Sequence, residues 1–176
     1  MTNRIVLTSV LSAFALAGLA NAQTGSGTLG VTATVDGSIN LTFVTDASGL
    51  AVTGTTTSTA SLPFGHVQMY GGTVPAGVTK TVSGTTSFSL ATPFDVRVDL
   101  ANSASTTYTL NATLATADAV NKWFIGATDI SSAAAFALTA AGEFGTAVPY
   151  TLKITVPASE AGGLITNSIG FTAIGG

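Results

Sequence analysis

Apolar and polar residues alternate with a period of two in several segments of this chain, and this pattern restricts the fold more than any other feature. The even-numbered positions of residues 93–100 are all apolar: Phe94, Val96, Val98 and Leu100. Most of the positions between them carry a charge. Successive side chains of a β-strand point to opposite faces, whereas an amphipathic helix needs apolar spacings of three and four. The segment therefore predicts a strand with one buried and one solvated face.

The same alternation recurs along the chain between turn-forming residues. It predicts further strands at 39–44, 79–84, 86–91, 108–114, 122–127, 150–156 and 164–174. We expect residues 93–100 and 108–114 to pair with each other as an antiparallel hairpin, and the Gly- and Pro-rich residues 62–77 to be irregular. Short strands and turns at this spacing predict an all-β fold, an antiparallel β-sandwich.

Residues 129–145 leave two interpretations open. Their alanine content favours one short helix, capped by Ser131 or Ser132. A pair of strands within the all-β domain is the alternative.

Residues 1–22 have the pattern of a signal peptide. Arg4 precedes an apolar run, which ends in Ala20-Asn21-Ala22, a cleavage site of the A-x-A type. The run is short for a membrane span, so we expect cleavage after Ala22, secretion, and no membrane span afterwards. The predicted organisation is a signal peptide at 1–22, a tether and candidate donor strand at 23–37, and a β-sandwich domain at 38–176.

A glycine pattern follows the expected cleavage site. Gly25, Gly27 and Gly30 fit G-x-G-x-x-G, which binds dinucleotides only between a strand and a helix. No strand precedes the pattern, and a β-branched run with poor helix propensity follows it. We therefore expect no nucleotide binding, and interpret residues 23–27, with Gly25 and Gly27, as a flexible tether.

Residues 28–35 alternate in the manner of an exposed strand. Threonine and glycine occupy the even-numbered positions, and apolar residues occupy the others: Leu29, Val31, Ala33 and Val35. The segment has neither the charge nor the proline that usually protects an open strand edge. It is therefore the candidate strand for contact between subunits.

The composition excludes several classes of protein. The chain is 46% hydrophobic and only 7% charged, with a formal net charge of −3 and no cysteine. A basic surface for nucleic acid is missing from such a sequence, and intrinsically disordered chains are far more polar. Without disulfides, a secreted domain depends on packing, pairing or assembly for its durability. So few charges favour a surface that neighbouring copies cover.

The sequence offers no recognisable catalytic or metal-binding pattern. His66 is the only histidine, which argues against a histidine metal pair or a Ser-His-Asp relay. Asp95 and Asp99 flank Arg97 on one strand face, where a cross-strand charge ladder is the expected role. We therefore expect neither enzymatic activity nor a cofactor or metal.

The whole chain expected after cleavage resembles secreted bacterial fimbrial subunits of the immunoglobulin-like class, which implies an antiparallel immunoglobulin-like β-sandwich, and the resemblance rests on three segments. The segments are GTLGVTATV, FDVRVDLANSASTTYTLNATL and YTLKITVPASEAGGLITNSIGFTAI. The resemblance is greatest to spore-coat-U-like pilins of archaic chaperone–usher pili, and extends to other donor-strand filaments of biofilms. It implies an extracellular, homopolymeric filament, in which the N-terminal strand of each subunit completes the sandwich of its neighbour. A periplasmic chaperone and usher are the assembly partners that it implies.

Two other classes of function remain open on the sequence alone. The first is a secreted, self-contained binding module or adhesin, for which one tryptophan and three tyrosines are a thin supply of aromatic contacts. The second is a structural protein of a surface layer or associated with an outer membrane.

Overall fold

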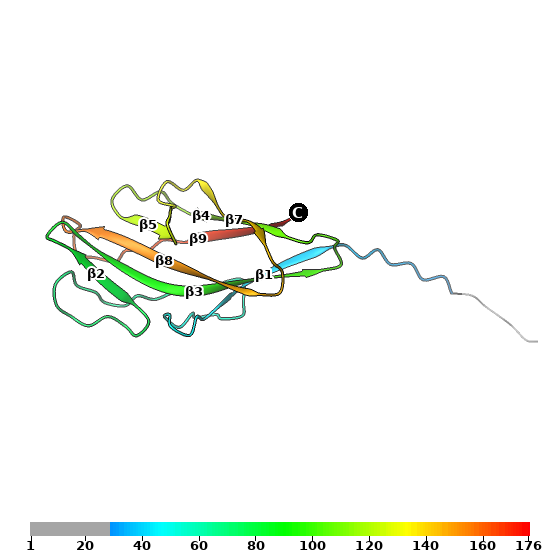
Figure 1. Ribbon diagram of the computed structural model, residues 1–176, viewed down its shortest axis with the longest axis horizontal. Coiled ribbons are helices and arrows are strands. Elements are labelled where there is room, and N and C mark those ends of the chain that lie inside the picture. The colour runs from blue at the N-terminus through cyan, green and yellow to red at the C-terminus, as the bar shows by residue number, and fades with distance from the viewer. Residues whose placement is uncertain (1–28) are drawn as a thin grey trace, which may run out of the picture. The chain divides into compact units, whose positions relative to one another are not determined.

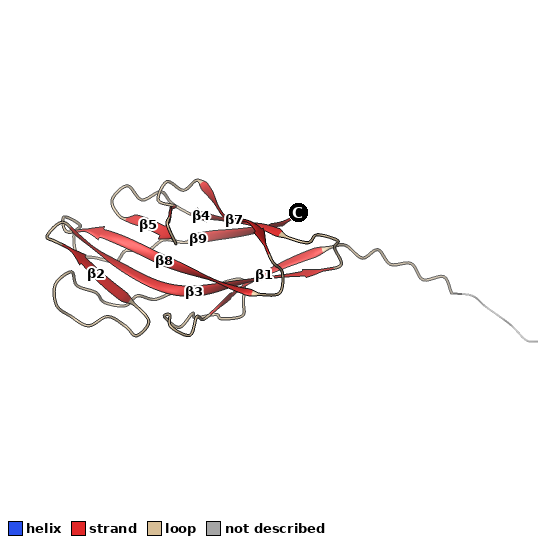
Figure 2. Cartoon of the chain, viewed as in Figure 1, coloured by secondary structure: helices blue, strands red, loops and turns tan. Residues whose placement is uncertain are grey.

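The computed structural model describes residues 29–176, which form an all-β structure without a helix (Figures 1 and 2). By contacts, the chain divides into residues 1–34 and residues 35–176, and the second unit holds every strand of the described residues. The strands are β1 (Ser38–Val44), β2 (Thr79–Ser83), β3 (Ser87–Ala101), β4 (Tyr108–Leu114), β5 (Lys122–Ile125), β6 (Thr128–Asp129), β7 (Ala135–Gly142), β8 (Ala147–Pro157) and β9 (Ile169–Gly175).

Two antiparallel sheets form the expected β-sandwich. The larger has the order β1-β3-β8-β5-β6, with β2 also pairing with β3, and the smaller has the order β7-β4-β9. Figure 1 shows β3 and β8 running side by side along the larger sheet, with β4, β7 and β9 in the other layer. The smaller sheet leaves β7 and β9 as its two edge strands.

Strand β3 merges two segments that the sequence predicts as separate strands. Its residues 87–91 pair with β2 and its residues 95–101 pair with β1 on the same side, while β8 lies along its other side. Pro93 falls in the gap between the two pairings, where its missing N–H costs no ladder hydrogen bond. Neighbouring Thr92 accepts a hydrogen bond at its Oγ1 from the N–H of Leu50, at 2.7 Å, and so attaches the loop after β1.

The core lies between the two sheets, and the predicted buried face of residues 93–100 is confirmed except at Leu100, which is half-buried and outside the core cluster. Val96 and Val98 of β3 are fully buried, as are Leu110 and Leu114 of β4. Arg97, on the opposite face of β3, is exposed. The other buried apolar residues are Leu50, Val52, Val78, Phe88, Leu90, Phe94, Tyr108, Ala112, Trp123, Ile125, Ile130, Leu152, Ile154 and Val156.

The predicted hairpin between residues 93–100 and 108–114 is wrong. Strand β3 belongs to the larger sheet and β4 to the smaller, so residues 102–107 connect the two layers. The alternation predicted which face of each strand is buried, and the two buried faces do contribute to one core. They meet across the sandwich, however, because alternation specifies a strand's face and not its neighbour.

The helix considered for residues 129–145 is also wrong, because β6 and β7 occupy most of this segment. Ser131 caps no helix. It is buried, and its Oγ accepts a hydrogen bond from the N–H of Trp123 at 2.9 Å. Pairing of β7 with β4 overrides the helix propensity of the alanines.

Candidate functional site

The N-terminal segment exposes its alternating apolar side chains. Residues 29–37 form no strand in the part of the chain that the structure describes. Leu29, Val31 and Val35 are 87%, 80% and 68% exposed, and Ala33 is exposed as well. The expected tether, with Gly25 and Gly27, the residue Thr28 and the signal peptide lie outside the described residues. The donor-strand role of residues 28–35 stays a prediction.

Strand β9 presents an unpaired, uncharged edge. Ser168 accepts a hydrogen bond from the N–H of Ala115 at 2.7 Å, and Gly176 donates one to Thr107 at 2.9 Å, so the even-numbered residues bond toward β4. In an antiparallel ladder the residues between them turn their N–H and C=O groups outward. These are Ile169, Phe171, Ala173 and Gly175, and no other strand within residues 29–176 pairs with them.

Strand β1 is the edge of the larger sheet, and loop residues cover part of it. Phe43 donates to the carbonyl of Thr57 at 2.9 Å and accepts from the N–H of Thr56 at 2.6 Å. Both bonds point away from β3, so alternation turns the N–H and C=O groups of Ile39 and Leu41 in the same direction. Only the beginning of β1 therefore offers a free edge among the described residues.

The edges β1 and β9 lie next to each other along one side of the sandwich. The rings of Phe43 and Phe171 meet edge to face at a centroid distance of 5.2 Å. Farther along, the Cδ1 atom of Ile39 lies 3.2 Å from where a Cβ of Gly175 would be. Because residue numbers rise along β1 as they fall along β9, the two strands run in opposite directions. We call this region, Ile39 to Phe43 and Ile169 to Gly175, the β1–β9 seam.

The other edge strands are less suited to pairing. Strand β7 has register shifts against β4 opposite Tyr108 and Leu110, and such irregularities disfavour edge-to-edge association. Strand β2 carries Lys80, whose Nζ donates to the carbonyls of Gln68 and Gly71 in the adjoining loop. Strand β6 has only two residues, one of them Asp129. Among the described edges, β9 therefore offers the longest regular edge that is both free and without charge.

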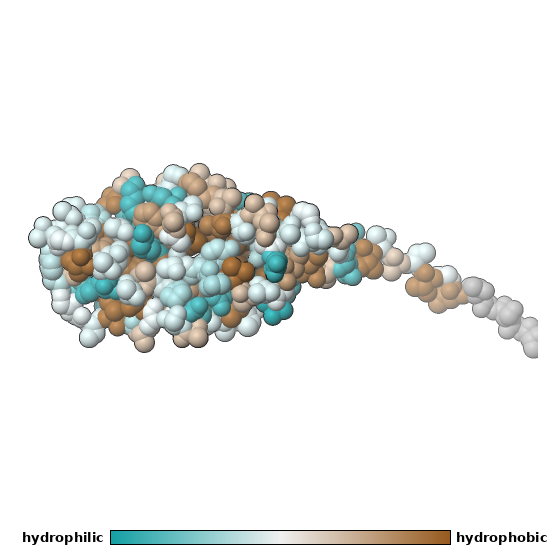
Figure 3. Space-filling model, viewed as in Figure 1, coloured by the Kyte–Doolittle hydropathy of each residue, from teal (hydrophilic) through white to brown (hydrophobic). Residues whose placement is uncertain are grey.

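Charged side chains are sparse on the sandwich. Figure 3 shows a mostly pale and brown face, with teal side chains in small groups. Nε of Arg97 lies 2.9 Å from Oδ1 of Asp99, and both side chains are substantially exposed. This pair lies within β3 and not across two strands, so the expected cross-strand ladder is wrong in that respect.

Asp118 is a structural carboxylate. It accepts hydrogen bonds from Nε1 of Trp123 at 2.8 Å and from the backbone N–H groups of Val120 and Asn121. Burial alone raises the pKa of this carboxyl, but the hydrogen bonds from Trp123, Asn121 and Val120 outweigh it and lower the pKa. The arrangement fixes the loop before β5 to the indole of Trp123, which is a core residue.

Asp95 is a carboxyl in an unfavourable position. Burial, and then the negative charge of neighbouring Asp46, raise the pKa of Asp95. Its Oδ1 is buried without a hydrogen-bond partner among the described residues. Asp46 accepts hydrogen bonds from both Oγ and N–H of Ser48, which lower its pKa. The two carboxyls thus have opposite pKa shifts, and the hydroxyl hydrogen-bonded to Asp46 is that of Ser48.

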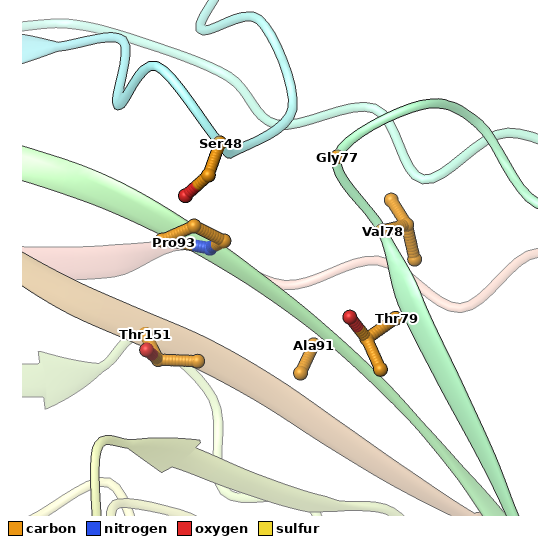
Figure 4. A pocket seen from close by; sticks show the side chains of 7 residues that line it. All are labelled: Ser48, Gly77, Val78, Thr79, Ala91, Pro93 and Thr151. Carbon is orange, nitrogen blue, oxygen red and sulfur yellow. The ribbon is translucent and has the colours of Figure 1, made fainter.

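Small-molecule and metal sites are poorly developed in residues 29–176. A shallow cavity of about 510 Å³ lies over β3, and Figure 4 shows the hydroxyls of Ser48, Thr79 and Thr151 among its lining side chains. Its remaining lining residues are Gly77, Val78, Ala91 and Pro93, so it offers no charge and no aromatic ring. His66 is exposed in the loop before β2, and between residues 29 and 176 no group of three or more acidic or histidine side chains is placed to hold a metal ion.

The comparisons give the chain no relative: it matches no known protein family, no curated protein and no solved structure. The described residues also include no helix of the length and apolarity needed to cross a membrane.

The sequence identified the N-terminal segment as a candidate site but missed the β1–β9 seam. The signal for β9 was present in residues 169–175, which lack charge and proline. That these residues form an edge depends on the order of strands in the sheet, which local pattern does not encode.

Proposed function

We propose that this chain is a structural subunit of an extracellular filament, which assembles when the N-terminal strand of one copy completes the sandwich of the next. The observation that carries the proposal is the exposure of Leu29, Val31 and Val35 in a segment that alternates as a strand yet forms none. A second copy is the proposed partner, and the resemblance to pilins adds a chaperone and usher as assembly factors. Secretion through the predicted signal peptide places the filament outside the cell.

The free energy of assembly requires main-chain pairing along the whole segment in addition to burial of its apolar side chains. Burying a Leu or Val side chain contributes about 1.5–3 kcal/mol. Fixing the backbone of each residue costs about 1–2 kcal/mol, and seven residues must be ordered. At these values the apolar side chains offset only part of the ordering cost, and main-chain pairing to a sheet edge must add the rest. A charge at one core-facing position is then enough to prevent assembly.

The test compares two neighbouring substitutions in the mature chain starting at Gln23. Val31→Asp places a charge on the apolar face of the segment, and Thr32→Asp places the same charge on the opposite face. We expect filaments from the wild type and Thr32→Asp, and only small particles from Val31→Asp, in negative-stain electron microscopy and sedimentation. Normal filaments from Val31→Asp, or a wild type that stays monomeric at high concentration, would refute the proposal.

A further inference from the structure

We propose that the edge of β9 receives residues 29–35 of a second copy, antiparallel, with Val31 opposite Ala173 and Ala33 opposite Phe171. This inference rests on the proposed function and identifies the receiving surface and the register. The acceptor has seven residues, 169–175, and residues 29–35 are the described part of the entering segment. The β1–β9 seam supplies the apolar surface that the entering strand covers.

The two strands match in the direction of their side chains. Ile169, Phe171 and Ala173 are half-buried toward the core and also turn their backbone groups to the free edge. A partner residue opposite each of them points its own side chain to the same face. The proposed register puts Leu29, Val31, Ala33 and Val35 on that face, where Ile39, 37% exposed, lies beside Gly175.

The register also matches side-chain size at most positions, and Val35 opposite Ile169 is the one pair of two bulky side chains. On the core-facing side Leu29 lies opposite Gly175, and Ala33 lies opposite Phe171. On the outer face Gly30 lies opposite Ile174, which is 56% exposed, and Thr32 lies opposite Thr172. Threonine pairs of this kind are favourable across antiparallel strands.

The parallel alignment is worse. It would place Gly30 beside Gly170 and Ala33 beside Ala173, and put Val31 against Phe171. Bulky residues would then meet bulky residues, while small residues would leave gaps that cost packing energy.

The direction in which residues 29–35 run relative to β9 distinguishes pairing between two copies from folding back within one chain. Strand β1 runs antiparallel to β9, so a segment that reverses at Asp36 and Gly37 would run parallel to β9. A tight turn at these residues would instead pair the segment with β1 and set Thr34 opposite Ile39 and Thr32 opposite Leu41. In this pairing the threonines lie on the same face as Ile39 and Leu41, toward the core, and the apolar residues of the segment point outward, because side chains alternate strictly between the two faces of a strand. An antiparallel partner for β9 therefore comes from another copy.

The absence of cysteine in the chain permits a direct cross-linking test. One full-length mature protein carries Thr172→Cys and an affinity tag, and a second, untagged, carries Thr32→Cys. These positions face each other as a non-hydrogen-bonded pair, in which side chains are closest and a disulfide can form. After mixing and mild oxidation we expect a tagged–untagged dimer as the main product on a non-reducing gel. Pairing Thr172→Cys with Thr34→Cys, one diagonal away, should lose that product because diagonal neighbours are too far apart for a disulfide.

The outcomes distinguish this inference from the proposed function. The proposed register is wrong if filaments assemble under reducing conditions and, on later oxidation, Thr32→Cys forms a disulfide with Thr42→Cys of β1 or Thr139→Cys of β7 but not with Thr172→Cys. That result would leave the proposed filament function intact. A chain that carries both Thr32→Cys and Thr172→Cys and cross-links only within itself, while the two single variants give no mixed dimer, overturns pairing between copies. If the protein forms neither filaments nor mixed dimers, both the filament function and the β9 register are wrong.

Discussion

The rings of Phe43 and Phe171 lie 5.2 Å apart in an edge-to-face contact, although the two residues belong to different sheets. Phe171 also meets the ring of Phe94 at 5.9 Å, so it joins the edge strand β9 to the centre of the larger sheet. Edge-to-face aromatic pairs add stabilisation beyond the area that they bury. The side chain that fixes β9 to the sandwich thus belongs to the strand proposed to receive a neighbour.

Replacing Phe171 should weaken the fold more than its position on an edge strand suggests. We expect Phe171→Ala to lower the free energy of unfolding by about 2–3 kcal/mol, somewhat less than a fully buried phenylalanine, because the residue is half-buried. Thr172→Ala, on the exposed face of the same strand, should change it by less than about 0.5 kcal/mol. Urea denaturation in the Val31→Asp background measures both without polymerisation, and equal losses would contradict the proposed role of Phe171.

Substitutions on the two faces of β3 should differ greatly in how much they destabilise the fold. Val98 is fully buried, so Val98→Asp places an unpaired charge in the core and should prevent folding. The Arg97–Asp99 pair is exposed, so Arg97→Ala should change the free energy of unfolding by less than about 1 kcal/mol. Circular dichroism and soluble yield test the pair, and a more damaging Arg97→Ala would show that the buried face of β3 was misassigned.

Sequence patterns predicted the faces of the strands well because burial acts on each strand locally. Val96, Val98, Leu110 and Leu114 are buried as the alternation requires. The pairing of β3 was not predictable in the same way, since its neighbours β1 and β8 are distant in sequence. The helix prediction for residues 129–145 failed for a related reason: alanines favour a helix locally, but β7 in this segment pairs with β4.

The candidate site was predictable to about the same degree. The exposed alternation of Leu29, Val31 and Val35 depends on local sequence alone and was identified from it. The receiving edge of β9 depends on the order β7-β4-β9, and its apolar surroundings depend on β1, more than a hundred residues away in sequence. Such relationships arise only once the chain has folded.

Gly142 should tolerate no side chain. A Cβ at this position would overlap the ring of buried Tyr108, the register partner of Gly142 in β4. We expect Gly142→Ala to lower the free energy of unfolding by roughly 1–3 kcal/mol, the range for overpacking a well-packed core. Gly163→Ala is the matched control, because a Cβ there meets nothing within 4 Å. Thermal unfolding in the Val31→Asp background measures both, and a neutral Gly142→Ala would mean that the Tyr108 ring has room to move.

Asp95 should destabilise the sandwich at neutral pH. Because burial and the charge of Asp46 raise its pKa in the folded state, the folded chain holds this proton more tightly than the unfolded chain. The contribution of Asp95 to the free energy of unfolding therefore falls as the pH rises from the ordinary value of 3.8 through the raised folded pKa. Asp95→Asn, which stays neutral, should be the more stable protein at pH 7.

The pH dependence of the stability difference between Asp95→Asn and the wild type shows whether the charge of Asp95 is its cause. The lowered pKa values of Asp46, Asp118 and Asp129 act in the opposite sense, since their stabilising contributions are lost as the pH falls through the folded pKa values. Only the difference between wild type and Asp95→Asn isolates Asp95. We expect a gain below about 1 kcal/mol at pH 7, because the group is partly exposed, and a shrinking gain below the ordinary Asp pKa, where Asp95 is protonated in both states. Urea denaturation across this pH range tests it, with exposed Asp36→Asn as control, and a gain that persists unchanged in acid would assign the effect to packing instead of charge.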